Sequence, residues 1–120
     1  MVTLKPIGHR ENKTTLDDFV RPKDSKILIN TPEFARFVHE VRKARDSKKQ
    51  IILQMGAHVI KTGQSLLLID LMRKGYITHI ALNGAGAIHD YEVSLIGGTS
   101  EDVESGLKDG SFGMWEETSR

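Results

Sequence analysis

The chain contains no cysteine, and it also lacks a strong charge of either sign. Without cysteine it can form neither disulfides nor thiolate zinc sites, which fits a reducing compartment such as the cytoplasm. Its 17 basic and 16 acidic residues give a formal charge of +1, too weak a field to indicate binding to nucleic acid or to an anionic membrane. We therefore expect its partners to be small molecules or proteins.

Long apolar runs are absent as well. No stretch approaches the roughly twenty apolar residues that a bilayer span requires, and the first residues do not read as a targeting segment. These observations predict a soluble, cytoplasmic protein. His9, His39 and His79 have no ligand-like spacing, so we expect no metal site.

Composition divides the chain at about residue 26. Residues 1–26 are polar and mixed in charge, and we expect them to form an N-terminal arm, whose short apolar cluster around Phe19 can dock on a partner surface. Thr31-Pro32 then has the sequence of a helix start, with a hydroxyl cap and a proline in the first turn. Residues 27–120 are predicted to form one domain.

Two strand-loop-helix units make up most of this domain. The apolar runs 51–55 and 76–82 are typical of buried strands, and each is followed by a glycine-containing loop, residues 56–63 and 83–90. A helix is predicted between them, over residues 65–74. This order predicts an α/β fold with a Rossmann-like, doubly wound parallel sheet that is incomplete in this chain.

The second glycine loop carries the strongest functional signal. Gly84 and Gly86 allow a tight turn and a close approach of the backbone to a ligand, and the N–H groups of the following helix point at the same space. Both loops fall at the edge where open parallel sheets bind ligands. The pattern is part of a dinucleotide fingerprint only, because His89 stands in place of a third small residue. The alternative is a strand-to-helix turn in which the glycines serve packing only, and such a turn has the same sequence pattern.

Titratable side chains near the loops are the candidate catalytic and binding groups. An imidazole titrates near neutral pH, so His89 can take a proton from an amine or an alcohol, while Asp90 or Glu92 can hold a substrate cation. Lys61 can meet a phosphate or a carboxylate. Structural alternatives are backbone bonding for His58, a solvated amine for Lys61 and a helix-dipole partner for Asp90. Farther along, Thr99 followed three residues later by an acidic side chain predicts a helix cap.

Three segments, GAHVIKTG (56–63), LIDLM (68–72) and NGAGAIHD (83–90), together resemble the amino-terminal half of deoxyhypusine synthase, and more closely the bacterial deoxyhypusine synthase-like proteins. The runs 98–103 and 112–114 extend the resemblance, so that it covers most of the chain from residue 30 onward. It implies a Rossmann-like domain with tightly bound NAD in a homotetramer. It also implies an NAD-dependent transferase that moves the aminobutyl group of spermidine to a protein lysine.

Carried over by position, the resemblance assigns a cofactor site and a substrate site. The residues placed along NAD are Ala57, His58, Lys61, Gly84, Ala85 and Gly86. Asp90 is placed near the cofactor and the polyamine. From the chemistry of the side chains, without the resemblance, Asp90 and Glu92 are the candidate substrate ligands, and His89 and Asp90 are the candidate catalytic pair. Because the synthase has paired glutamates where this chain has His89-Asp90, a different amine or guanidino substrate stays open.

Three functions follow from these residues. The first is a deoxyhypusine synthase-like, NAD-dependent transferase acting on a polyamine or a related amine. The family's catalytic lysine has no counterpart here, so we expect this chain to be the cofactor-binding, amino-terminal part of a longer protein. The second is a non-catalytic nucleotide-binding module or regulatory subunit of the same fold. The third is a different α/β enzyme that uses His89 and Asp90 directly.

Overall fold

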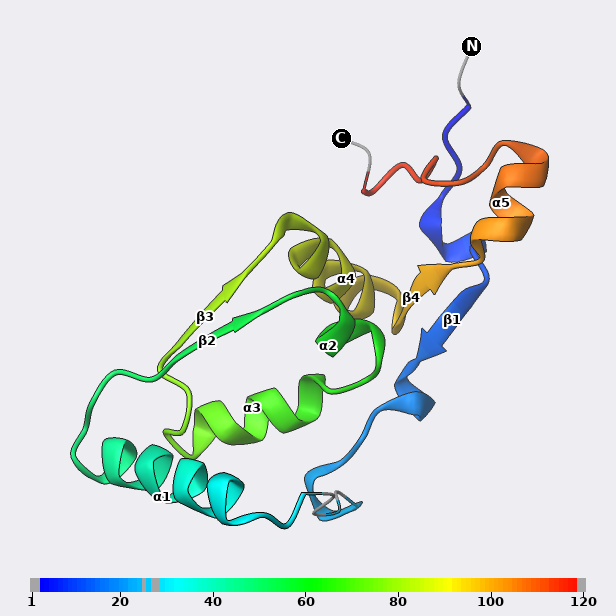
Figure 1. The fold of residues 1–120 in the computed structure, drawn as a ribbon. Coiled ribbons are helices and arrows are strands. Elements are labelled where there is room, and N and C mark those ends of the chain that lie inside the picture. Colours follow the sequence, from blue (N-terminus) through cyan, green and yellow to red (C-terminus); the bar gives the residue numbers. More distant parts are fainter. Residues whose placement is uncertain (1–2, 25, 27–28, 119–120) are drawn as a thin grey trace.

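The computed structural model describes residues 3–24, 26 and 29–118, which contain two separate two-stranded sheets with helices beside them (Figure 1). One sheet pairs β2 (Ile52–Met55) with β3 (His79–Leu82) in parallel, with Met55 opposite Leu82. The other pairs β1 (Asn12–Thr15) with β4 (Gly98–Glu101) in antiparallel orientation. Each sheet therefore joins segments that lie far apart in the sequence.

Helices fill most of the chain between these strands. They are α1 (Pro32–Asp46), α2 (His58–Lys61), α3 (Ser65–Arg73), α4 (Gly84–Ile96) and α5 (Val103–Asp109), with short 3-10 turns η1 (Ile7–His9), η2 (Leu16–Asp18) and η3 (Pro22–Asp24). Thr31 caps α1 as predicted, because its hydroxyl accepts the N–H of Phe34 at 3.2 Å. Across the part of the chain that the structure describes, no helix is both long and apolar enough to cross a bilayer.

The parallel sheet and its helices form the unit that positions the candidate site. Strand β2 leads through α2 and α3 to β3, which is the helical crossover that parallel pairing requires. Ile60, Leu68 and Ile77 are buried together, and Leu53 and Ile80 on the sheet pack against them. Because both strands run the same way, α2 and α4 begin at the same edge of the sheet.

Helix α1 lies outside this core. None of its fifteen described residues is buried, and Phe34 and Phe37 stay exposed with their ring centroids 6.2 Å apart. Its C-terminal end is attached through Arg45, whose guanidinium lies 4.3 Å from the centroid of the Tyr76 ring. The predicted helix is confirmed.

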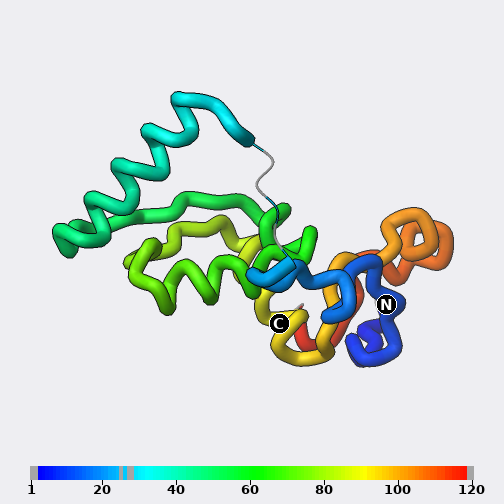
Figure 2. Tube along the Cα trace, turned by 90° about the horizontal axis from the view of Figure 1, so that it is seen from below, coloured from blue at the N-terminus to red at the C-terminus, as the bar shows by residue number. Residues whose placement is uncertain are grey.

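The N-terminal segment packs against the C-terminal one, as the two ends of the trace show (Figure 2). The N–H of Lys5 bonds to the carbonyl of Met114 at 2.9 Å, and the side chains of Ile7 and Trp115 are buried. Phe19, expected to dock on a partner, is buried within the chain instead. Residues 3–24, predicted to belong to a polar arm, thus contribute strand β1 and several buried side chains. The domain boundary near residue 26 stays a prediction.

One capping prediction was wrong. Thr99 does not begin a helix, because residues 98–101 pair with β1 as a strand and bury Thr99 completely. Asp102 caps α5 instead, since its carboxylate accepts the N–H of Ser105 at 2.9 Å. Pairing with a distant strand overrode the local capping signal.

Candidate functional site

The two glycine loops meet at the carboxyl edge of the parallel sheet. Met55 and Leu82 are opposite each other at the ends of β2 and β3, so that Gly56 and Asn83 follow at the same level. An open groove of about 590 Å³ lies at this edge, lined by Gln54, Met55, Gly56, Ala81, Leu82 and Asn83. The structure thereby brings together the starts of the two segments that the sequence singled out. The second segment is not a loop, because residues 84–90 belong to α4.

Helix α4 begins in this groove. The side-chain oxygen of Asn83 accepts the N–H of Gly86 at 2.9 Å and so caps the helix. The first N–H groups of a helix have no intrahelical acceptor, and no described residue accepts from Gly84 or Ala85. The start of α4 therefore offers two backbone donors and the positive end of the helix dipole beside the groove.

Gly56 and Gly84 leave room at this edge. A Cβ built on either glycine would meet no heavy atom of the described chain within 4 Å, and neither glycine has a positive φ. The chain's own packing therefore leaves space at these two positions, and a backbone without side chains allows a ligand to approach it closely. Gly86 differs, because its Cβ would lie 2.8 Å from Cδ1 of Leu82. A side chain at Gly86 would therefore require the side chain of Leu82 to move.

The first predicted loop contains a short helix. Ala57 occupies the N-cap position of α2, and its carbonyl accepts the N–H of Lys61 at 3.0 Å. His58 is exposed, and its carbonyl accepts the hydroxyl of Thr62 at 2.8 Å. The carbonyl of Lys61 accepts the hydroxyl of Thr14 at 2.7 Å, which ties α2 to β1. Contact of Ala57, His58 and Lys61 with a cofactor stays a prediction.

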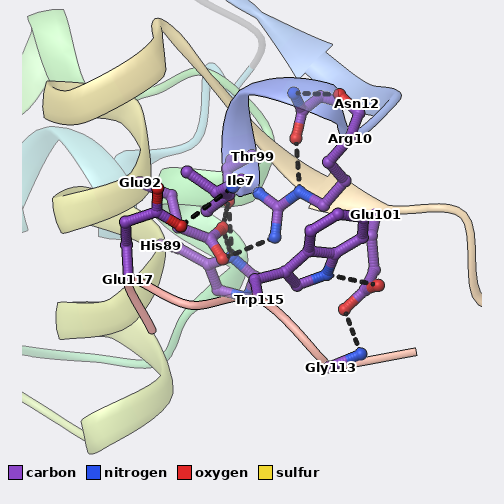
Figure 3. A network of polar contacts seen from close by, with 10 residues as sticks. All are labelled: Ile7, Arg10, Asn12, His89, Glu92, Thr99, Glu101, Gly113, Trp115 and Glu117. Carbon is purple, nitrogen blue, oxygen red and sulfur yellow. Dashed lines mark hydrogen bonds and ion pairs between the residues drawn. The ribbon is translucent and has the colours of Figure 1, made fainter. Parts of the chain in front are cut away.

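Glu92 belongs to a buried polar network on the side of α4 that faces β4 (Figure 3). Its side chain is 5% exposed, and its Oε1 lies 2.7 Å from Nη1 of Arg10, whose side chain is 3% exposed. Thr99 donates its hydroxyl to Oε2 of Glu92, and Nδ1 of His89 lies 2.6 Å from Oγ1 of Thr99. Both oxygens of Glu92 are thus engaged within the chain, and its cation in this structure is Arg10 rather than a substrate.

Arg10 connects this network to both ends of the chain. Its Nε donates to Oδ1 of Asn12 at 2.9 Å, and its guanidinium lies 5.7 Å from the centroid of the Trp115 ring. Trp115 in turn donates its indole N–H to Glu101 at 2.8 Å. Reasoning from the sequence missed Arg10, because a lone arginine in a polar segment shows no periodic or motif signal.

Asp90 lies on a different side of α4 from His89. It borders an apolar cavity of about 490 Å³ whose lining includes Leu68, Leu82 and Tyr91. Successive residues of an α-helix point about 100° apart, which explains the separation. The structure therefore does not bring the two predicted catalytic side chains together, and their catalytic roles stay predictions. Among the described residues, no three His, Asp or Glu side chains are arranged to hold a metal ion.

Protonation of the network should weaken the fold in acid. Burial alone would raise the pKa of Glu92, but hydrogen bonds from Arg10 and Thr99 and the nearby positive charge lower it below its ordinary 4.5. A carboxyl group with a lowered folded pKa stabilises the protein above its unfolded pKa, and this contribution is lost as the pH falls through the folded pKa. We predict that the free energy of unfolding decreases below about pH 4.5.

Urea unfolding at a series of pH values tests this dependence. Asp102 contributes with the same sign, because the Ser105 N–H and Lys13 lower the pKa of its carboxyl to about 2. Asp102→Asn should therefore remove only the lower part of the acid profile, and Glu92→Gln should remove the part due to the network. A stability that stays constant or increases as the pH falls from 5 to 3 would contradict the prediction.

Comparison with known proteins places the chain in a family. The family model described as "Arginine dihydrolase ArgZ-like, C-terminal, Rossmann fold" matches residues 35–118. The bifunctional arginine dihydrolase/ornithine cyclodeaminase AgrE of Nostoc sp. is 36% identical over 58 residues, which are 48% of this chain and 8% of that protein. The match therefore spans a small part of that relative's length. No solved structure matches the chain.

The resemblance to deoxyhypusine synthase was wrong, since the matched family and the relative both bear other names. The aminobutyl transfer from spermidine and the polyamine substrate are overturned with it, and the homotetramer and protein lysine acceptor lose that support. The physical reason is that a strand, a glycine turn and a helix recur in Rossmann-like domains with unrelated chemistry. The alternative of a non-catalytic nucleotide-binding module stays a prediction.

The predicted fold class is confirmed. The matched description names a Rossmann fold, and the structure has the parallel pair β2–β3 with its helical crossover as part of such a sheet. The match covers most of the chain, from residue 35 to residue 118. The chain therefore belongs to the family of ArgZ-like arginine dihydrolase C-terminal domains with a Rossmann fold.

Proposed function

We propose that this chain supplies the NAD-binding part of an enzyme that acts on an arginine-derived amino acid of the ornithine type. The observation that carries the proposal is the pair Gly56 and Gly84, which face open space at the carboxyl edge of β2 and β3. Dinucleotides bind at this edge of Rossmann folds, with their pyrophosphate on a helix N-terminus. The substrate class comes from the relative, whose name joins arginine dihydrolase to ornithine cyclodeaminase.

The residues at this edge fit the phosphates of a dinucleotide. A Cβ at Gly84 or Gly56 would fill space that a pyrophosphate needs, and the N–H groups of Gly84 and Ala85 can donate to its oxygens. His58 and Lys61 are basic side chains on α2, which starts at the same edge. When bound, NAD would supply a hydride acceptor, while the protein binds and orients the reactants.

Asp90 is the candidate partner for the cation of the substrate. Its cavity and the glycine groove share Met55 and Leu82 in their linings, so the two hollows adjoin. Asp90 is exposed, whereas Glu92 is buried and already paired with Arg10. An ornithine-type amino acid carries an ammonium group that an exposed carboxylate can hold beside the groove.

NAD binding by calorimetry tests the proposal. Gly84→Val places a branched side chain in the open space beside the first turn of α4, and we expect it to weaken NAD binding at least about tenfold, because two charge-assisted hydrogen bonds are disturbed. Gly84 is a better position than Gly86, where a new side chain would collide with Leu82.

Gly8 offers a matched control. It lies in η1, its Cβ would also meet nothing within 4 Å among the described residues, and it does not line the groove. Gly8→Val should bind NAD like the wild type, and circular dichroism of each variant checks its folding. A wild-type chain that does not bind NAD, or equal binding by Gly84→Val and wild type, would overturn the proposal.

A further inference from the structure

Thr99 sits at the centre of the polar network and has a single hydrogen to donate. Its side chain is completely buried, so the hydroxyl has no access to bulk water. It has two polar neighbours, Oε2 of Glu92 and Nδ1 of His89, the latter at 2.6 Å. A hydroxyl donates once and can accept as well, so one neighbour must receive the hydrogen and the other must supply one.

Glu92 receives it. An ionised carboxylate only accepts hydrogen bonds, and Arg10 at 2.7 Å favours the ionised form. If Thr99 donated to His89 instead, Oε2 of Glu92 would lose its charge-assisted bond inside the protein, which is the more costly arrangement. The hydroxyl of Thr99 therefore points at Glu92.

His89 must then donate to Thr99. The oxygen of Thr99 can only accept from the imidazole, which puts a hydrogen on Nδ1 and leaves a lone pair on Nε2 of the neutral ring. The side chain of His89 is 19% exposed, and among the described residues Nε2 is neither hydrogen-bonded nor a buried atom without a partner. This nitrogen is therefore accessible to a ligand.

The position of His89 relates it to the glycine groove. His89 follows Ala85 by four residues on α4, which places both on one face of the helix, one turn apart. The N–H of Ala85 is one of the two backbone donors at the start of the helix. His89 thus lies one helical turn after the backbone donor of Ala85.

We propose that Arg10, Glu92 and Thr99 form a positioning chain that holds neutral His89 with its hydrogen on Nδ1. Nε2 is thereby presented as the base for the second ammonium group of an ornithine-type substrate, the one that Asp90 does not hold. The identity of the proton donor rests on the proposed function, whereas the tautomer does not. Transfer of one proton from the ammonium group to Nε2 gives a free amine and an imidazolium. The carboxylate of Glu92, with Oε2 at 3.5 Å from Nδ1, offsets the new charge, and the proton then passes to water.

The tautomer of His89 can be observed directly by NMR. Long-range correlation of ring nitrogens with ring hydrogens in the 15N-labelled chain, at about pH 8 where histidine is neutral, should show His89 protonated on Nδ1. Thr99→Ser keeps the hydroxyl and should keep this tautomer. Thr99→Val has nearly the same shape without the hydroxyl, and it should lose the preference. Protonation of wild-type His89 on Nε2, or an unchanged tautomer in Thr99→Val, would overturn the positioning chain.

Measurements of enzyme activity test the role of His89 as a base independently of its tautomer. In the ornithine reaction of the protein that carries this chain, Thr99→Val should lower kcat/KM at least about tenfold and Thr99→Ser should retain most of it, because general-base catalysis contributes about 10²–10⁴-fold. Normal turnover by Thr99→Val despite a lost tautomer would overturn the role as a base. If NAD fails to bind while the tautomer is as expected, the proposed function falls and the positioning chain stands. If Thr99→Val does not fold, the tautomer of the wild type decides.

Discussion

Replacing Arg10 by methionine is expected to lower the free energy of unfolding by about 3–5 kcal/mol, because Glu92 would stay buried without its cation. The two side chains are 3% and 5% exposed, and 2.7 Å separates Nη1 from Oε1. Removing one partner of such a pair leaves the desolvation penalty of the other uncompensated. Methionine keeps most of the apolar stem of arginine, so lost packing contributes little. Urea unfolding followed by circular dichroism measures the change.

An exposed ion pair of the same length is the matched control. Lys108 and Glu104 are also 2.7 Å apart, one turn apart on α5, and their side chains are 72% and 79% exposed. Lys108→Met should cost less than about 1 kcal/mol, because water solvates the remaining carboxylate. Similar losses for Lys108→Met and Arg10→Met would show that burial does not strengthen the Arg10–Glu92 pair.

A second substitution tests the cause of the loss. If the uncompensated charge of Glu92 destabilises Arg10→Met, then adding Glu92→Leu should recover part of the stability, because an apolar pair of similar volume has no charge to desolvate. A double variant less stable than Arg10→Met would instead indicate that packing of the arginine against Trp115 dominates. The double variant is also expected to lose the His89 tautomer preference, since Thr99 would no longer have a carboxylate to donate to.

Local signals predicted much of the parallel unit. The helix over residues 65–74 was predicted between the two strands, and the structure has α3 there. Helix α4 begins earlier than expected, at Gly84 inside the second predicted loop, because Asn83 caps it. The strand expected over residues 76–82 is shorter, since β3 starts only at His79. The glycine groove was predictable because two loops at the ends of parallel strands must share one sheet edge.

Long-range pairing could not be predicted in the same way. Arg10 and Glu92 are 82 residues apart, and the sequence gives no sign of which cation neutralises a particular acid. Glu92 was therefore interpreted as a substrate ligand, although its partner lies within the chain. Thr99 was interpreted as a helix cap for a similar reason, because its pairing partner in β1 comes from a segment with no strand-like pattern.

The family assignment shows what glycine loops do and do not determine. Their spacing after two strands predicted a Rossmann-like fold, which the matched family confirms. The same spacing led to the wrong family, because the side chains that select a substrate are not those that shape the turn. In this chain Gly56 and Gly84 shape the edge, whereas Asp90 and His89 differ from the acidic pair expected of the synthase.

Gly63→Ala is expected to destabilise the chain by about 2–4 kcal/mol, from backbone strain together with a steric clash. Gly63 has a φ of +72° where α2 turns into α3, and a Cβ there would lie 2.6 Å from the carbonyl oxygen of Asp18. The clash is with backbone, which cannot move aside as a flexible side chain would. The carbonyl of Gly63 also accepts the N–H of Val20 at 2.9 Å, so a shift would disturb the contact between η2 and the parallel unit.

Gly110→Ala is the control that measures the cost of backbone strain without the steric clash. It has nearly the same φ, +74°, but a Cβ there would meet no heavy atom of the described chain within 4 Å. Gly110→Ala should therefore cost only the strain of a left-handed alanine, about 1–2 kcal/mol. Thermal and urea unfolding of the two variants give the difference, which we assign to the contact with Asp18. Equal losses of unfolding free energy in the two variants would mean that the backbone at Asp18 moves to accommodate the new Cβ. The N-terminal segment would then be held to the parallel unit less firmly than the burial of Phe19 indicates.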